Sequence, residues 1–181
     1  VRNGEESILN ILNDLRKQNY NGNLEFIIVD DDSNDNTEKI IYDFILDDDR
    51  FKYLNTKNYK SDLKHKKKAL DYGISESKYD WLLFTDVDCR LNRNWSLEMS
   101  KNFNNSNYII GFSEVKKSKT LASKFQYIDF KMLMVSAFSS TALGFPLACI
   151  GQNQAYSKKL FIQNKGFSKI KDLLQGDDSI F

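Results

Sequence analysis

Two short apolar runs, each ending in carboxylates, place the strongest constraint on the fold of this chain. Residues 24–30 read LEFIIVD and residues 79–88 read YDWLLFTDVD, and the apolar side chains in both runs follow one another directly. Such a run is typical of a strand that is covered on both faces of a sheet. Helical patterns stand between the predicted strands. This alternation predicts an α/β fold, with a mostly parallel, Rossmann-like sheet flanked by helices.

The other elements are predicted from periodicity and residue type. Further strands are expected at residues 50–56 and 107–115, and helices at residues 8–15, 37–46, 66–77, 96–103, 121–138 and 158–164. An uncharged run over residues 132–150 has about the length of a membrane span. Because this run contains Ser, Thr, Gly and Pro, we expect a buried helix followed by a loop instead.

Composition restricts the chemistry that the chain can perform. The formal net charge of +1 gives no indication of a nucleic-acid partner. His65 is the single histidine, and Cys89 and Cys149 form no CxxC pair, which argues against zinc sites and a Ser-His-Asp triad. The cysteines are expected to be reduced thiols of a cytoplasmic protein. Carboxylates are therefore the available catalytic groups.

Acidic residues follow both apolar runs. Asp30, Asp31 and Asp32 end the first run, and Asp86 and Asp88 end the second. In α/β sheets ligands bind outside the carboxyl ends of the strands, so we expect both groups to face one cleft. A D-x-D pair of hard oxygen ligands suits Mg²⁺ or Mn²⁺, particularly when a diphosphate supplies further oxygens.

Each acidic group also has a purely structural interpretation. Asp35 or Asn34 could simply cap the helix expected from Thr37, because Asp, Ser and Asn favour turns and helix N-termini. The D-x-D pair could simply belong to a solvated loop at the end of the strand. A third group, Gly176-Asp177-Asp178, could contain a general base or could complement a helix dipole. The residues alone leave these alternatives open.

Taken in order, these groups resemble the family-2 glycosyltransferases of the GT-A fold. The similar stretches are VRNGEES at the start, VDDDSNDNT (29–37), KKKAL (66–70), FTDVDC (84–89), GQNQAY (151–156) and GDD (176–178). The chain departs from the family pattern at Asp32 and Asn36, where glycine is frequent, and at His65, which replaces the glycine before Lys66. The family's first strand and its region beyond the catalytic acid have no counterpart, so we expect a fragment of a longer enzyme.

The resemblance implies an inverting, metal-dependent transferase that moves a sugar from a nucleotide-diphosphate donor, UDP by default, to a hydroxyl group of a glycan or lipid. It divides one domain into a nucleotide-binding part, about 1–90, and an acceptor part, about 91–181, and allows membrane association through further segments. The implied site residues are Asp30, Asp31, Ser33, Lys66 and Asp86 for the nucleotide, Asp86 and Asp88 for Mg²⁺ or Mn²⁺, Gly151 and Asn153 for the donor and acceptor cleft, and Asp177 with the general base Asp178 for catalysis.

Three other functions share part of this pattern. A haloacid-dehalogenase-type phosphohydrolase would use Asp86 and Asp88 with Ser113 and Lys165, but Arg90 stands at its usual Thr or Val position. That class also leaves the first acidic group unexplained. A non-catalytic sugar-nucleotide-binding protein would not need the acids of the metal and catalytic motifs, yet this sequence contains them. A nucleotidyltransferase would need a glycine-rich triphosphate loop, which the sequence does not contain.

Overall fold

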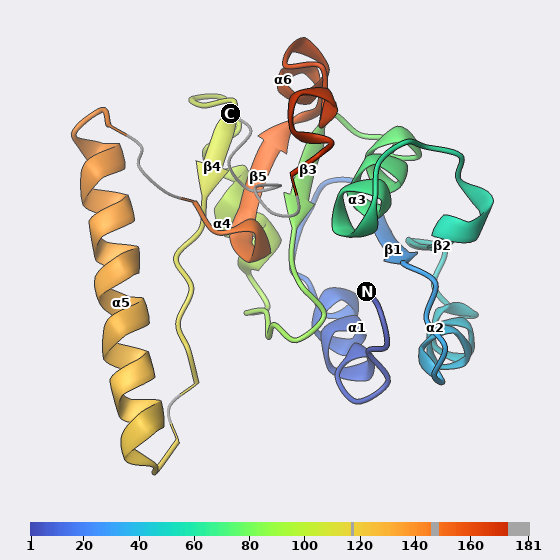
Figure 1. Cartoon of the computed structure of the whole chain (residues 1–181), viewed down its shortest axis with the longest axis horizontal. Coiled ribbons are helices and arrows are strands. Elements are labelled where there is room, and N and C mark those ends of the chain that lie inside the picture. Colours follow the sequence, from blue (N-terminus) through green and yellow to red (C-terminus); the bar gives the residue numbers. More distant parts are fainter. Residues whose placement is uncertain (117, 146–148, 174–181) are drawn as a thin grey trace.

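The computed structural model describes residues 1–116, 118–145 and 149–173, and Figure 1 shows helices grouped around two small sheets. The helices are α1 (Ile8–Arg16), α2 (Thr37–Ile45), α3 (His65–Ser75), α4 (Trp95–Ser100), α5 (Leu121–Ala142) and α6 (Lys158–Gln163), and the 3-10 turns are η1 (Thr56–Asn58), η2 (Gly151–Asn153) and η3 (Ser168–Ile170). The strands are β1 (Phe26–Asp30), β2 (Phe51–Asn55), β3 (Trp81–Phe84), β4 (Tyr108–Ile110) and β5 (Gln154–Ser157). Each predicted helix and strand is present, with ends shifted by a few residues.

The strands form two separate sheets. β1 and β2 pair in parallel, with Phe26 opposite Phe51 and Asp30 opposite Asn55. The second sheet has the order β3-β5-β4, and β5 runs antiparallel to both of its neighbours. The α/β class and its parallel pair are thus confirmed. The antiparallel pairs were not predicted, because the four residues of β5 are too few to show a periodicity in the sequence.

Two groups of buried apolar side chains form the core, one for each sheet. The first lies around α1, α2, β1 and β2, and its buried members are Ile8, Ile11, Leu12, Leu15, Phe26, Ile41 and Phe51. The second joins α3, β3, β5 and α6, and its buried members are Ile74, Leu82, Tyr156, Phe161 and Phe167. The two groups have no member in common, so each sheet carries its own core.

The prediction of a buried helix in residues 132–150 was wrong. α5 stands at one edge of the molecule (Figure 1), and the side chains of Met132 and Leu133 are 66% and 62% exposed. Only Met134 and Ala137 are buried on this helix, because its packing is restricted to one narrow face. Within the described ranges, no helix combines the length and the apolar character that crossing a bilayer requires.

Candidate active site

Asp30 organises the first acidic loop from inside the protein. Its side chain is fully buried, and its Oδ1 accepts hydrogen bonds from the Ser33 N–H at 3.0 Å and the Ser33 hydroxyl at 2.6 Å. The Tyr53 hydroxyl donates to Oδ2 at 2.9 Å. Burial and the neighbouring Asp30 carboxylate raise the pKa of Tyr53, which keeps this donor protonated. Asp30 and Ser33 therefore hold the loop that carries Asp31.

Replacing Asp30 by alanine should lower the free energy of unfolding by about 1–3 kcal/mol, because the partly buried donors on Ser33 and Tyr53 lose their acceptor. Urea unfolding measures this loss. Asp32→Gly is the control, since it removes a neighbouring, half-exposed carboxylate whose ion pair with Lys57 lies at the surface, and glycine suits the positive φ of that position. The assigned role of Asp30 is refuted if the two variants lose equal stability.

The rest of the loop is fastened to the start of the chain. Ser33 Oγ accepts from the Asn3 N–H at 2.8 Å, and Asp35 Oδ1 accepts from the Thr37 N–H at 3.0 Å. The N-cap residue of α2 is Asn36, whose side chain makes no capping bond, and it is Asp35, one residue earlier, that accepts the first N–H of the helix. Asp32 has a φ of 57°, a left-handed conformation that Asp tolerates better than most residues. The turn thus survives without the glycine frequent in the family.

Asp31 is more accessible than Asp30 and less exposed than Asp32: its side chain is 18% exposed, against 46% for Asp32. Its carboxylate is half-buried, accepts a hydrogen bond from Thr56 Oγ1 at 3.1 Å and lies 3.9 Å from a guanidinium nitrogen of Arg2. Unlike Asp30, it is not surrounded by donors from its own loop. A ligand at this rim can therefore reach it.

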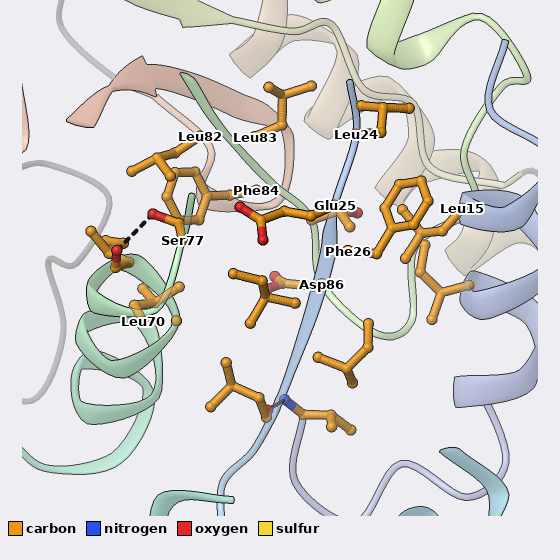
Figure 2. A pocket seen from close by; sticks show the side chains of 18 of the residues that line it. Leu15, Leu24, Glu25, Phe26, Leu70, Ser77, Leu82, Leu83, Phe84 and Asp86 are labelled. Carbon is orange, nitrogen blue, oxygen red and sulfur yellow. Dashed lines mark hydrogen bonds between the residues drawn. The ribbon is translucent and has the colours of Figure 1, made fainter. Parts of the chain in front are cut away.

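The second acidic group lies at the end of β3. Lys66 Nζ is 3.4 Å from Asp86 Oδ1, and both side chains are partly exposed. Asp88 is exposed. Asp31, Lys66, Asp86 and Asp88 all border one cavity between the two sheets, and Figure 2 shows Asp86 among the side chains around it. The structure thus brings Asp31 of the first acidic group to the same cavity as Asp86 and Asp88, whereas the predicted Asp30 and Asp32 do not border it.

The acids at this rim have the ligand chemistry of the predicted Mg²⁺ or Mn²⁺. The described residues contain no group of three His, Cys, Asp or Glu side chains that could enclose a metal. Asp86 and Asp88 supply two hard carboxylates at an open position, which matches the preference of Mg²⁺ for a few carboxylates together with waters and phosphate oxygens. These carboxylate ligands fit a cation that the protein and the phosphate oxygens of a substrate coordinate together.

A pair that sequence reasoning missed holds the loop after β3. Arg90 donates two hydrogen bonds to Asp14 on α1, from Nε at 2.6 Å and from a terminal nitrogen at 2.9 Å. The Leu91 N–H donates to the same carboxylate at 3.0 Å. The partners lie far apart in sequence, so no local pattern could reveal them. They fix the course of the chain just beyond Asp88.

The Asp14–Arg90 pair predicts a pH dependence. The hydrogen bond from Arg90 holds the pKa of Asp14 below its usual 3.8, although desolvation opposes this shift. The stabilising contribution is therefore complete above the usual pKa and is lost as the pH falls through the lower folded-state pKa. The stability difference between wild type and Asp14→Asn should be constant above about pH 5 and should shrink below the usual pKa.

Urea unfolding at a series of pH values measures this difference. Asp43→Asn, which changes an exposed carboxylate on α2, is the control and should show no comparable trend. If the difference between wild type and Asp14→Asn stays the same down to acid pH, the pair contributes nothing through ionisation of Asp14.

Gly151 and Asn153 lie in η2, next to the loop of the second acidic group. Cys89 Sγ is 3.6 Å from Gln152 Oε1, which joins this turn to that loop. Asn153 Oδ1 accepts from the Trp95 indole at 2.9 Å, and its Nδ2 donates to the Phe112 carbonyl and to Ser113 Oγ. The Asn153 amide therefore holds neighbouring segments together, and Gly151, the first residue of the turn, is buried. Asp177 and Asp178, the predicted catalytic pair, lie outside the described residues.

Residues 1–163 match the family model of glycosyl transferase family 2. The poly-beta-1,6-N-acetyl-D-glucosamine synthase of Staphylococcus epidermidis is 25% identical over 146 residues, which is 79% of this chain and 34% of that protein. This chain thus spans about a third of the length of that curated relative.

Two solved structures share the fold. The mannosyltransferase PcManGT from Pyrobaculum calidifontis, in complex with GDP-Man and Mn²⁺, has a TM-score of 0.70 at 18% identity, with 99% of this chain and 48% of that chain covered. S. aureus TarS 1–349 in complex with UDP has a TM-score of 0.65 at 18% identity, with coverage of 96% and 50%. At these identities the likeness shows the fold alone.

Proposed function

Because the chain belongs to glycosyl transferase family 2, we propose that it forms the catalytic part of an enzyme that transfers a sugar from a nucleotide-diphosphate donor to a hydroxyl group of a glycan. The meeting of Asp31, Asp86, Asp88 and Lys66 at one rim of the cavity is the observation that carries this proposal. The family match decides against the phosphohydrolase interpretation. The structures with bound UDP and GDP-Man support a nucleotide-sugar donor, and the synthase relative supports a glycan acceptor.

In this proposal Asp31 binds the base of the nucleotide. Uracil and guanine each present a ring N–H, and a carboxylate is a strong acceptor for it. Asp30 and Ser33 take no direct part in this contact, because their polar atoms already bond to one another. They position Asp31 by fixing the loop. UDP is the proposed donor nucleotide and GDP is the alternative.

Asp86 and Asp88 would hold the divalent cation beside the diphosphate. When bound, the cation supplies a Lewis acid that stabilises the charge of the leaving diphosphate. Lys66 adds a positive charge at the same rim, since its ammonium lies next to Asp86. The two carboxylates also orient the donor. They follow β3, and the Asp14–Arg90 pair fixes the course of the chain just beyond Asp88.

Asp178 is proposed as the general base. Its carboxylate would accept the proton of the acceptor hydroxyl while the oxygen forms a bond to the anomeric carbon and the bond from that carbon to the diphosphate breaks. The nucleoside diphosphate leaves with the bonding electrons. A single displacement from the face opposite the leaving group inverts the configuration of the sugar.

Calorimetric titration of the chain with UDP and GDP, each with and without Mn²⁺, tests the proposal. We expect one nucleotide to bind only in the presence of metal, and Asp31→Ala to abolish this binding. Asp47→Ala, which changes an exposed carboxylate beyond α2, is the control and should bind as the wild type does. A folded sample that binds neither nucleotide under any condition would contradict the proposal.

A further inference from the structure

One face of α5 carries a row of large apolar side chains that the described part of the chain leaves uncovered. Figure 1 shows this helix at the edge of the molecule. The row, called the α5 stripe below, consists of residues that are each at least 50% exposed: Leu121, Phe125, Ile128, Met132 and Val135. Single exposed apolar residues are ordinary on a protein surface, but a contiguous row of large ones marks an interaction surface.

The body of the protein packs against the opposite face of this helix. Met134 and Ala137 are the buried residues of α5, and the ring of Phe138 lies 5.4 Å from that of Phe112. Successive residues of an α-helix are rotated by about 100°, so Met134 points about 200° away from Met132 of the stripe. The contacts that hold α5 to the body therefore leave the stripe available to a partner.

The spacing of the α5 stripe is that of a coiled-coil seam. Its residues follow one another at intervals of four, three, four and three positions, which is the alternation of the two core positions, a and d, of a heptad repeat. The small residues Ser139 and Ala142 continue this spacing to the end of the helix. Such a seam is narrower than the apolar face of most amphipathic helices, and it fits a second helix better than a flat lipid surface.

The charges beside the stripe indicate which helix is the partner. With Phe125 and Met132 at position a, the exposed Lys124 occupies position g and the exposed Asp129 position e. In a parallel pair of identical helices, each g residue faces the following e residue of the other copy, so each Lys124 meets an Asp129. In an antiparallel pair the g positions face one another, which would set Lys124 or Lys131 against a lysine of the other copy.

We propose that α5 is a dimerisation helix, through which two copies of this chain associate as a parallel, two-stranded coiled coil with the α5 stripe as its seam. The same surface of both copies then forms the interface, as two-fold symmetry requires. The two bodies lie on opposite sides of the helix pair, because each body contacts the far face of its own helix. The inference rests on the surface of α5 and does not depend on the proposed transferase function.

Sedimentation velocity over a range of concentrations measures the oligomeric state of the chain, and we expect a monomer–dimer equilibrium. Ile128→Glu places a charge at the centre of the seam and should raise the dissociation constant of the dimer by at least about 100-fold. Leu46→Glu, which changes an exposed apolar residue beyond α2, is the matched control and should dimerise as the wild type does. Circular dichroism shows whether each variant keeps its helices.

Charge reversal tests the identity and the direction of the partner. Lys124→Glu and Asp129→Lys should each raise the dissociation constant by about tenfold, because each turns both charge pairs of the dimer from attractive to repulsive. The double variant restores both pairs and should return to within about threefold of the wild type. Unchanged or tighter association of Lys124→Glu would overturn the parallel pairing, and so would a double variant that dimerises no better than the single ones.

Two further outcomes would overturn the proposal. One is a chain that stays monomeric up to about 0.5 mM, and the other is a dimer that Ile128→Glu leaves intact, since its interface would then lie elsewhere. Co-sedimentation with vesicles of phosphatidylcholine and phosphatidylserine tests a lipid surface as the other occupant. A monomeric chain that binds these vesicles, and loses this binding in Ile128→Glu, would assign the stripe to a membrane and not to a second copy.

Discussion

Asp178→Asn should reduce the rate of sugar transfer by about 10²–10⁴-fold, the usual contribution of a general base, while UDP affinity stays nearly unchanged. An amide cannot accept the acceptor proton at neutral pH but has almost the same shape as the carboxylate. The variant therefore removes proton transfer and leaves the donor site intact. The rate of sugar transfer is measured as the rate at which the nucleoside diphosphate is released from a nucleotide-sugar.

The neighbouring acid provides the control for this prediction. Asp177→Asn changes the adjacent carboxylate of the same pair and should cost less activity than Asp178→Asn. The assignment of the base is wrong if Asp177→Asn is the more damaging variant. Equal UDP affinity in both variants is needed for the comparison, because a drop in affinity would indicate a disturbed donor site.

Asp88→Ala and Asp86→Ala should each weaken Mn²⁺ binding in the presence of UDP by at least about 100-fold. Changes to groups that only orient metal ligands typically cost roughly 10–100-fold in affinity, and loss of a carboxylate ligand should cost at least as much. Transfer activity should fall in parallel. Electron paramagnetic resonance of free Mn²⁺ in a titration measures the affinity directly.

Asp43→Ala, on the exposed face of α2, is the control for metal binding and should leave the Mn²⁺ affinity unchanged. Thermal unfolding of each variant shows whether the protein remains folded. Wild-type Mn²⁺ affinity in a folded Asp88→Ala protein would remove this residue from the proposed metal site. Removal of the metal by a chelator should abolish nucleotide binding by the wild-type protein.

Much of the site could be predicted from local patterns. Strand ends in an α/β fold share a rim, and both acidic groups were therefore expected to meet, as Asp31 and Asp86 do beside the cavity. The bond from the first N–H of α2 to Asp35 also follows from residue type, since a short acidic side chain before a helix can accept a free N–H. Such features depend on residues that are close in the chain.

Other features required the folded structure. The Asp14–Arg90 pair and the Asn153 bridge to Trp95 join segments that are distant in sequence. The part of α5 from Met132 on was expected to be buried because it belongs to an uncharged run, yet burial depends on which neighbours are present to cover a helix. The composition of a helix does not show which neighbouring segments cover it in the folded protein.

The sequence by itself determined the order of the helices and of all strands except β5, the positions of the acids and the resemblance to a transferase family, because these are carried by periodicity and short motifs. Only the tertiary structure decided which acids are structural and which are accessible. Asp30 and Asp31 are adjacent and chemically identical, but Asp30 is buried among Ser33 and Tyr53 whereas Asp31 faces the rim.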